Sequence, residues 1–180
     1  MQTKSIVITG PESSGKTTLA NRLADHFGAQ WLPEYAREYI DQLERPYTES
    51  DLLAIAEGQL AREQEAIEKS SGILFLDTSL EVIKIWGEYK FGRCHPWILD
   101  QMQKQTHTLY LLCQPDIPWE YDPQRENPSD RDVLFDLYRL HLTNQNIKFV
   151  EINGLNEIRL TKAIHHVQSL INLHPHADHA

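Results

Sequence analysis

The sequence has few cysteines, no long apolar run and no excess of positive charge. Its two cysteines, Cys94 and Cys113, are far apart and form no C-x-x-C motif, so we expect free thiols in a reducing cytoplasm. No apolar run approaches the length of a membrane span, and the first residues lead straight into a predicted strand. We therefore expect neither a membrane segment nor a secretory signal. The net charge of −9 argues against a broad basic surface for nucleic acid.

The composition that is present fits one globular domain. Of the 180 residues, 41% are hydrophobic and 24% are charged, which is ordinary for a domain with a sizeable core. We expect a single domain over residues 1–172 and a flexible tail over 173–180. The tail carries His174, His176 and His179 without any pattern that would fix their geometry. A zinc or nickel ion bound there would be adventitious, and the metal that we expect is Mg²⁺.

One motif indicates the class of the protein. Residues 10–18 read Gly-Pro-Glu-Ser-Ser-Gly-Lys-Thr-Thr, which matches the phosphate-binding loop G-x-x-x-x-G-K-[ST]. The glycines let backbone N–H groups face the phosphates, Lys16 can reach the β- and γ-phosphates, and the Thr17 hydroxyl can bind Mg²⁺. A β-branched run precedes the loop and a helical pattern follows it, so a turn that merely links strand and helix is the weaker interpretation. The residues expected around the nucleoside triphosphate are Gly10, Glu12, Ser13, Ser14, Gly15, Lys16, Thr17 and Thr18.

Apolar strands and helical patterns alternate along the chain. Five segments read as strands: 4–9, 29–32, 73–77, 108–113 and 147–152. Helical patterns follow the P-loop and recur at 35–44, 49–69, 79–90, 96–104, 130–143 and 155–172. The alternation predicts an α/β three-layer sandwich, in which helices cover both faces of a five-stranded parallel sheet. Ligands of such sheets bind beyond the carboxyl ends of the strands, so the residues after each strand are the functional candidates.

A carboxylate and a guanidinium follow the second strand. Pro33 ends that strand and places Glu34 at the sheet edge beside the phosphate site. Glu34 could accept a proton from an attacking hydroxyl, and Arg37 could bind an anionic oxygen. The alternative is an acid that complements a helix dipole, with Arg37 as its surface partner.

The third strand ends in an acid. Asp77 follows the apolar run 73–76, which is the usual position of the acid that holds Mg²⁺ or orients the nucleophile beside a P-loop. The alternative is an N-cap, which Asp77, Thr78 or Ser79 could each supply. We expect Asp77 in the functional role and Thr78 as the cap.

The next helix carries aromatic residues. Trp86 and Tyr89 could stack on a flat aromatic substrate, although aromatic residues at this spacing more often belong to a core. His95, close behind them, is expected on the surface or in a helix cap rather than in catalysis.

A long polar segment after the fourth strand, about 115–130, reads as a lid. Arg125 and Arg131 could close over a transferring phosphoryl group and neutralise its charge. Trp119 and Asp122 could grip the substrate. The alternative is a solvated loop that leads into the cap of the next helix.

Two weaker signals concern a cap and a turn. Ser129 or Asp130 could cap the helix at 130–143. Asn153 and Gly154, after the last strand, form a plausible turn beside the nucleotide base.

Taken in order, the motifs resemble a known family. They are the P-loop at 10–17, Pro-Glu-Tyr-Ala-Arg-Glu-Tyr at 33–39, Leu-Asp-Thr-Ser at 76–79 with Trp86 and Phe91-Gly92, and Asp-Ile-Pro-Trp at 116–119 with Arg125 and Arg131. This set resembles the NadR-type ribosylnicotinamide kinases, from the first strand to the last helix. The family's kinase domain phosphorylates nicotinamide riboside with ATP and gives nicotinamide mononucleotide, a step of NAD salvage.

The resemblance implies roles for particular residues. It implies that Lys16 and Thr17 lie at the phosphates and Mg²⁺, and that Asp77 lies near the metal and the attacking hydroxyl. It also implies lid arginines at Arg125 and Arg131. The aromatic residues, which include Tyr35, Trp86, Tyr89 and Trp119, are expected near the nicotinamide. Better-known members also carry a DNA-binding segment and a nucleotidyltransferase domain. Because this sequence contains no H-x-G-H motif, we expect neither adenylylation nor repressor activity.

The leading hypothesis is an ATP-dependent kinase of nicotinamide riboside, in which Asp77 or Glu34 deprotonates the 5′-hydroxyl. The alternatives are a kinase of another nucleoside or small alcohol, and a regulatory ATPase that signals through a partner. The sequence does not indicate the oligomeric state.

Overall fold

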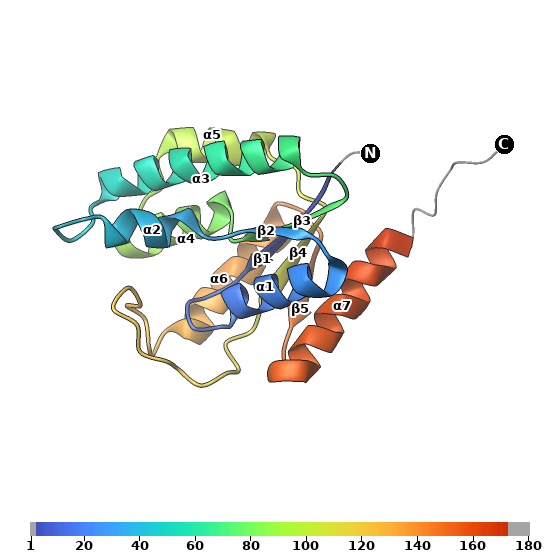
Figure 1. Ribbon diagram of the computed structural model, residues 1–180. Coiled ribbons are helices and arrows are strands. Elements are labelled where there is room, and N and C mark those ends of the chain that lie inside the picture. The colour runs from blue at the N-terminus through green and yellow to red at the C-terminus, as the bar shows by residue number, and fades with distance from the viewer. Residues whose placement is uncertain (1–2, 173–180) are drawn as a thin grey trace.

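The computed structural model describes residues 3–172, and the histidine tail lies outside the described residues. Within this range, five strands form one all-parallel sheet in the order β2-β3-β1-β4-β5, with helices on both faces (Figure 1). The three-layer α/β fold predicted from the sequence is confirmed. The strands are β1 (Lys4–Thr9), β2 (Gln30–Leu32), β3 (Ile73–Asp77), β4 (Leu109–Cys113) and β5 (Phe149–Ile152). The helices are α1 (Lys16–Phe27), α2 (Tyr35–Asp41), α3 (Glu49–Lys69), α4 (Leu80–Phe91), α5 (Pro96–Lys104), α6 (Arg131–Asn144) and α7 (Asn156–Asn172).

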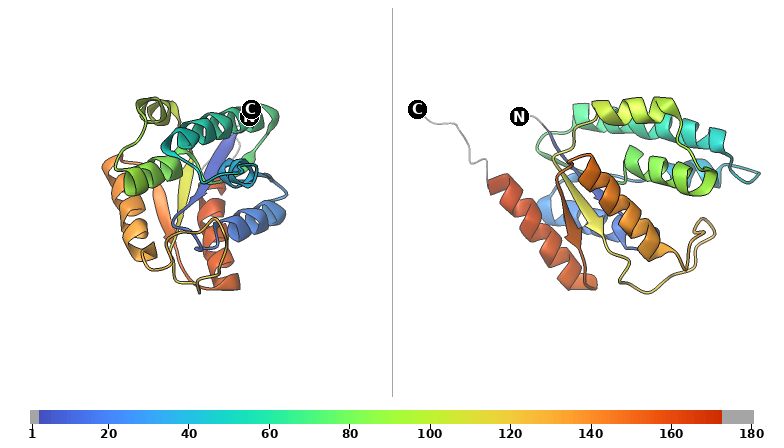
Figure 2. Two further views of the ribbon diagram at one scale, coloured as in Figure 1. Left: turned by 90° about the vertical axis from the view of Figure 1, so that its left-hand side faces the viewer. Right: turned by 180° about the vertical axis from the view of Figure 1, so that it is seen from behind.

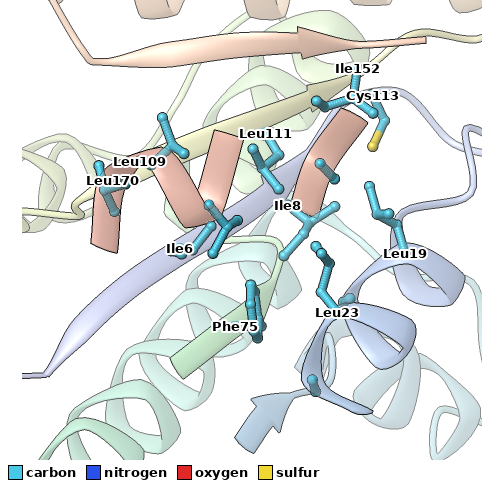
Figure 3. Packing of buried hydrophobic residues seen from close by; sticks show 14 residues of the cluster. Ile6, Ile8, Leu19, Leu23, Phe75, Leu109, Leu111, Cys113, Ile152 and Leu170 are labelled. Atoms are coloured by element: carbon cyan, nitrogen blue, oxygen red, sulfur yellow. The ribbon is translucent and has the colours of Figure 1, made fainter. Parts of the chain in front are cut away.

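Alternate strand residues point to opposite faces, and each face has its own core. Ile6, Ile8 and Phe75 pack with α1 and α7 on one face, where Leu23 and Val167 are fully buried. Figure 3 shows this cluster, with side chains of α1 directed at the strands. The other face packs against α3, α4 and α6 through the alternating strand positions. Figure 2 shows the two helical layers on either side of the sheet.

Predicted and observed elements differ mainly at their ends, for local reasons. The strand predicted at 147–152 begins at Phe149, because Asn146 adopts a positive φ of 53° and the Ile147 N–H still bonds Leu142 O. The helix predicted at 35–44 ends at Asp41, four residues before Arg45. A residue that precedes a proline, here Pro46, is disfavoured in helical conformation, so the chain leaves the helix before it.

The parallel register brings the strand ends together at one edge of the sheet. Ile8 pairs with Asp77, Thr9 with Leu112, and Cys113 with Ile152. The P-loop, the acid after β3 and the start of the lid therefore meet at this edge, as expected for a parallel α/β sheet.

Candidate active site

The P-loop joins β1 to α1 in a tightly constrained conformation. Gly10 has φ +132°, and a Cβ there would lie 2.6 Å from the Cys113 carbonyl oxygen, so no larger residue fits. Gly15, with φ +77°, is the N-cap of α1. Inside the loop, Ser14 Oγ donates to Pro11 O at 2.7 Å and Lys16 Nζ donates to the same oxygen at 2.9 Å. The lysine thus spans the loop in which the sequence predicts phosphates.

Thr17 and Asp77 form the most direct link between the P-loop and β3. The Thr17 hydroxyl donates to Asp77 Oδ2 at 2.6 Å. Asp77 is buried, and its Oδ1 has no hydrogen-bond partner in the described part of the chain. Burial raises the pKa of Asp77, while the Thr17 hydrogen bond and the charge of Lys16 oppose this rise. An unpartnered carboxylate oxygen beside a threonine hydroxyl is a donor set that fits Mg²⁺.

Glu34 brings a second carboxylate to this edge. It occupies the N-cap position of α2, two residues after the end of β2, and lines the cavity beside Lys16. Burial raises the pKa of Glu34; Lys16 opposes the rise and Asp77 adds to it. Two acids that influence each other therefore lie beside one lysine, an arrangement typical of proton transfer.

The cap of α4 corrects one expectation. The N-cap is Ser79, whose Oγ donates to Glu81, and not Thr78. Thr78 instead adopts a positive φ of 73°, which turns the chain sharply after Asp77. Two further cap expectations are confirmed. His95 caps α5 by accepting from Trp97 N at 3.2 Å, and Asp130 is the N-cap residue of α6.

A cavity of about 570 Å³ opens beside the P-loop and reaches the region between α2, α4 and the lid. Its walls include Glu34 and Arg37 from the β2–α2 region and Trp86 and Tyr89 from α4. The aromatic pair therefore lies where a flat group could stack. The volume is in the range of small-molecule sites. The P-loop residues expected at the phosphates, from Gly10 to Thr18, also line this cavity.

The lid lies against both the P-loop and α2. Asp122 accepts from Arg37 at 2.8 Å, and Arg125 Nη1 lies 3.4 Å from Ser13 Oγ. The backbone N–H groups of Glu126 and Asn127 both donate to the Glu12 carboxylate. The segment that reads as a lid in the sequence therefore bridges the phosphate loop and the other side of the cavity.

Arg131 does not line the cavity and bonds instead to the backbone of the P-loop and of the lid. Its Nη1 donates to Ser13 O and to Ile117 O, both at 3.0 Å. Its guanidinium also faces the Trp119 ring at 5.7 Å from the centroid. It thus holds the P-loop backbone to the start of the lid.

Four other candidates also do not line the cavity: Tyr35, Asp77, Trp119 and Asp122. Tyr35 packs against α3, with Arg62 at 4.3 Å from its ring centroid, and neither Trp119 nor Asp122 belongs to the cavity lining. Their expected contact with a substrate remains a prediction.

Two residues of the site were missed by the sequence reasoning. Arg159 of α7 is buried and lines the cavity, and its side chain donates to Ser14 O at 2.7 Å. It shares the buried face of α7 with Ala163 and Val167, at four-residue spacing, so a lone arginine on an apolar stripe was the available signal. Tyr47, in the α2–α3 loop, accepts from Trp86 Nε1 at 2.8 Å and donates to Glu126 Oε2 at 2.7 Å. No motif marks it.

Residues 3–172 contain no helix that is long and apolar enough to span a membrane. In the same range, no group of three or more His, Cys, Asp or Glu side chains is arranged to hold a metal ion. A Thr17–Asp77 site would contain only one such side chain, Asp77, and is therefore not a group of that kind.

Known proteins resemble this chain over most of its length. It is 29% identical over 157 residues to the trifunctional NAD biosynthesis/regulator protein NadR of Salmonella typhimurium, a match over 83% of this chain and 38% of the relative. A crystal structure of NadR protein in complex with NR has a TM-score of 0.81 at 22% identity and covers 99% of this chain and 52% of that one. Another, in complex with NAD and AMP-PNP, has a TM-score of 0.82 at 22% identity and covers 98% and 52%.

The chain thus spans less than half of the length of that curated relative. The resemblance to NadR inferred from the motifs is confirmed by this similarity. The model of a protein family described as an AAA domain matches residues 5–159, which include the P-loop, Asp77, the lid and Arg159. This chain therefore belongs to the AAA domain family of P-loop proteins.

Proposed function

We propose that the protein is an ATP-dependent kinase that transfers the γ-phosphoryl group to the 5′-hydroxyl of nicotinamide riboside. The products are ADP and nicotinamide mononucleotide, and the hydroxyl proton passes to a carboxylate. One observation carries the proposal: Lys16 and Glu34 line the P-loop end of a cavity whose walls also carry Trp86 and Tyr89, and Asp77 is bonded to Thr17 of the P-loop. ATP hydrolysis requires the P-loop, whereas a kinase also requires a cavity that holds the phosphoryl acceptor.

On the donor side, the P-loop residues hold the triphosphate. Lys16 lies within reach of the loop interior, where its charge would stabilise the β- and γ-phosphates. Thr17 and Asp77 would hold Mg²⁺. Thr17 supplies a hydroxyl, and Asp77 supplies a carboxylate oxygen, Oδ1, that has no hydrogen-bond partner among the described residues. When bound, Mg²⁺ supplies positive charge to the phosphate oxygens.

On the acceptor side, a carboxylate orients the hydroxyl and takes its proton. Glu34 and Asp77 are both suited to this role, because each has a raised pKa and therefore gains basicity relative to a free carboxylate. Arg37, paired with Asp122, closes the acceptor side against the lid. Trp86 and Tyr89 would contact the nicotinamide ring.

The lid would complete the site. Arg125 extends from the lid to Ser13 Oγ, so a phosphoryl group in transfer would meet a positive charge from that side. Phosphoryl transfer needs mainly positioning and charge stabilisation, which these residues supply.

The comparisons support the same substrate. The similar curated protein is named for NAD biosynthesis, and similar structures contain NR in one case and AMP-PNP in the other. Because the chain spans 38% of that relative, the proposed reaction is that of the matching region alone.

The test is a mass-spectrometric assay of the purified protein with Mg-ATP and nicotinamide riboside. We expect ADP and nicotinamide mononucleotide in equal amounts. If no mononucleotide forms but another nucleoside is phosphorylated in a parallel panel, the proposed substrate is wrong and the kinase activity stands. ADP that forms at the same rate with and without every acceptor would instead support an ATPase switch and overturn the proposal.

A further inference from the structure

Arg159 is a buried charge with several partners, and it lies outside the predicted site residues. It comes from α7, far from the P-loop in sequence, and is 5% exposed. Its guanidinium donates to three backbone carbonyls: Gly154 O at 2.8 Å, Ser14 O at 2.7 Å and Gln114 O at 3.0 Å. Its Nη2 also contacts the Asp116 carboxylate. A single side chain therefore ties together the P-loop, the end of β4 and the turn after β5.

The bond to Ser14 O has a consequence for the phosphate loop. The Ser14 carbonyl and the Gly15 N–H belong to one planar trans peptide, so they point in opposite directions. A donor that holds the carbonyl fixes the direction of the following N–H. Arg131 makes the same kind of contact one residue earlier, with Ser13 O, and so fixes the Ser14 N–H. Two arginines from two helices thus hold consecutive peptides of the loop.

We propose that Arg159 is a positioning residue for phosphate binding, because it holds the Ser14 carbonyl outward and thereby turns the Gly15 N–H toward the bound phosphates. This inference rests on the proposed function, since it requires a nucleoside triphosphate in the loop. Asp116 supports the role from the other side. It contacts the guanidinium and accepts from Gly154 N at 2.6 Å, so the arginine is anchored at a fixed place.

Lysine cannot replace arginine in this geometry. Arginine reaches Gly154 O through Nε, Ser14 O through Nη1 and Gln114 O through Nη2, which is a planar fork. A lysine would keep the positive charge near the loop but satisfy fewer of these carbonyls. The comparison of the two therefore separates the positioning effect from the charge alone.

The experiment measures the binding of a non-hydrolysable ATP analogue with Mg²⁺ by calorimetry, together with KM for ATP and for the acceptor. In Arg159→Met we expect the Kd of the analogue and the KM for ATP to rise at least tenfold, with the KM for the acceptor changed less than twofold. Arg159→Lys should show a smaller rise of several-fold. Arg139→Met serves as the matched control, because Arg139 is an exposed arginine that pairs with Asp136 on α6.

A second readout follows the loop directly. In ¹H–¹⁵N spectra of the wild type, the Gly15 amide resonance should shift strongly on titration with the analogue, and Arg159→Lys should reduce that shift. A purely structural role would instead raise both KM values together and leave the Gly15 shift at saturation unchanged, which would overturn the inference. If Arg159→Met does not fold, Arg159→Lys decides by the same criteria.

The failures of the two proposals are distinguishable. A wild-type protein that neither binds the analogue nor transfers phosphate refutes the proposed function, and this inference with it. If the wild type, Arg159→Met and Arg159→Lys all bind the analogue with equal affinity, only the positioning role is refuted.

Discussion

At the scale of single residues, the site combines charged groups, each of which would be unfavourable if it were buried without the others. Asp77 and Glu34 are held close enough to affect each other, and each is partly or fully removed from water. Lys16 offsets part of this cost, because its ammonium favours the ionised form of both acids. Such clusters persist where ligand binding requires them, and they destabilise the ligand-free protein.

Lys16→Ala should remove catalysis and keep the fold. In the structure, the ammonium makes one hydrogen bond, to Pro11 O, so its loss changes little packing. We expect kcat to fall by about 10²-fold or more, because a charge on the developing phosphoryl oxygens is lost. The measurement is steady-state ADP formation, with circular dichroism to confirm folding. Lys104→Ala, which removes an exposed lysine paired with Asp100, should keep wild-type activity. Full activity in Lys16→Ala would contradict the mechanism.

The pH profile should identify the base. The pKa values of Glu34 and Asp77 lie above the ordinary values of 4.5 and 3.8, so each acid keeps its proton to higher pH than a free carboxyl does. A base acts only when ionised, so kcat/KM should rise with pH through a limb centred above 4.5 if Glu34 is the base, or above 3.8 if Asp77 is the base. Measured profiles of Glu34→Gln and Asp77→Asn should show that limb lost in one variant and kept in the other. A wild-type limb at or below 3.8 would refute a base with a raised pKa, and a limb at or below 4.5 that is lost in Glu34→Gln would refute a raised pKa at Glu34.

At the scale of elements, α3 positions the start of α2 and hence Glu34. Gly58 leaves room for the Tyr35 ring, because a Cβ at residue 58 would lie 2.0 Å from Tyr35 Cε1. The next residue, Gln59, accepts from Tyr35 N at 2.9 Å. The residue that follows Glu34 is therefore fixed both by shape and by a hydrogen bond.

Gly58→Ala should reverse the usual effect of such a change in a helix. Alanine normally stabilises a helix by roughly 0.5–1 kcal/mol relative to glycine. Here we expect a loss of about 1–3 kcal/mol, because the Tyr35 ring must move. Urea denaturation measures it. In a Tyr35→Ala background the same change should be neutral or stabilising, and a double-mutant cycle without coupling would contradict this reading.

A second contact of α3 involves a buried acid. Glu63 is buried opposite His107, with 3.6 Å between Oε1 and Nε2, and accepts from Gln105 Nε2 at 2.9 Å. Burial, and next the charge of Glu81, raise the pKa of Glu63 to about 8, while burial lowers the pKa of His107. Both side chains are therefore neutral near neutral pH in the folded protein.

Glu63→Gln should make stability less dependent on pH. In the folded wild type Glu63 keeps its proton up to about pH 8, whereas the unfolded chain loses it near 4.5. The folded state then binds more protons, so the free energy of unfolding falls as pH rises from about 4.5 to about 8. We expect the variant to lack this fall, a difference on the order of a few kcal/mol at pH 8. Denaturation at several pH values measures it, and parallel curves for the two proteins would refute the assignment.

At the scale of the whole molecule, the lid joins parts that the sheet alone does not connect. It contacts the P-loop through Glu12, α2 through Arg37 and α4 through the Lys90–Glu126 ion pair at 2.7 Å. Nucleotide binding should therefore stabilise the entire domain rather than one loop.

The melting temperature should rise with nucleotide. At a concentration one hundred times Kd, a ligand that binds only the folded state adds about 2.7 kcal/mol of stability. For a domain of this size that corresponds to a rise of roughly 5–10 °C in Tm. Thermal scans with Mg²⁺ and a non-hydrolysable ATP analogue measure it, and Lys16→Ala should show a smaller rise at the same concentration. The absence of any shift in the wild type would argue against nucleotide binding.

The sequence by itself determined the features that depend on local pattern. Residues 10–17 defined the P-loop, the runs at 4–9 and 73–77 defined their strands to the residue, and the alternation of strands and helices implied a parallel sheet. Once the sheet is parallel, Asp77 must lie at the same edge as the P-loop. These predictions succeed because turn chemistry and hydrophobic spacing act over a few residues.

Only the tertiary structure decided which side chains meet across the chain. It placed Arg159 on Ser14, 145 residues away, and turned Tyr35 toward α3 rather than into the cavity. It also gave Tyr47 a role between Trp86 and the lid. Such contacts depend on how whole helices pack against the sheet, and a buried polar group finds its partner wherever packing brings one within hydrogen-bond distance. The spacing of residues along the sequence does not indicate which side chains come within that distance in the folded protein.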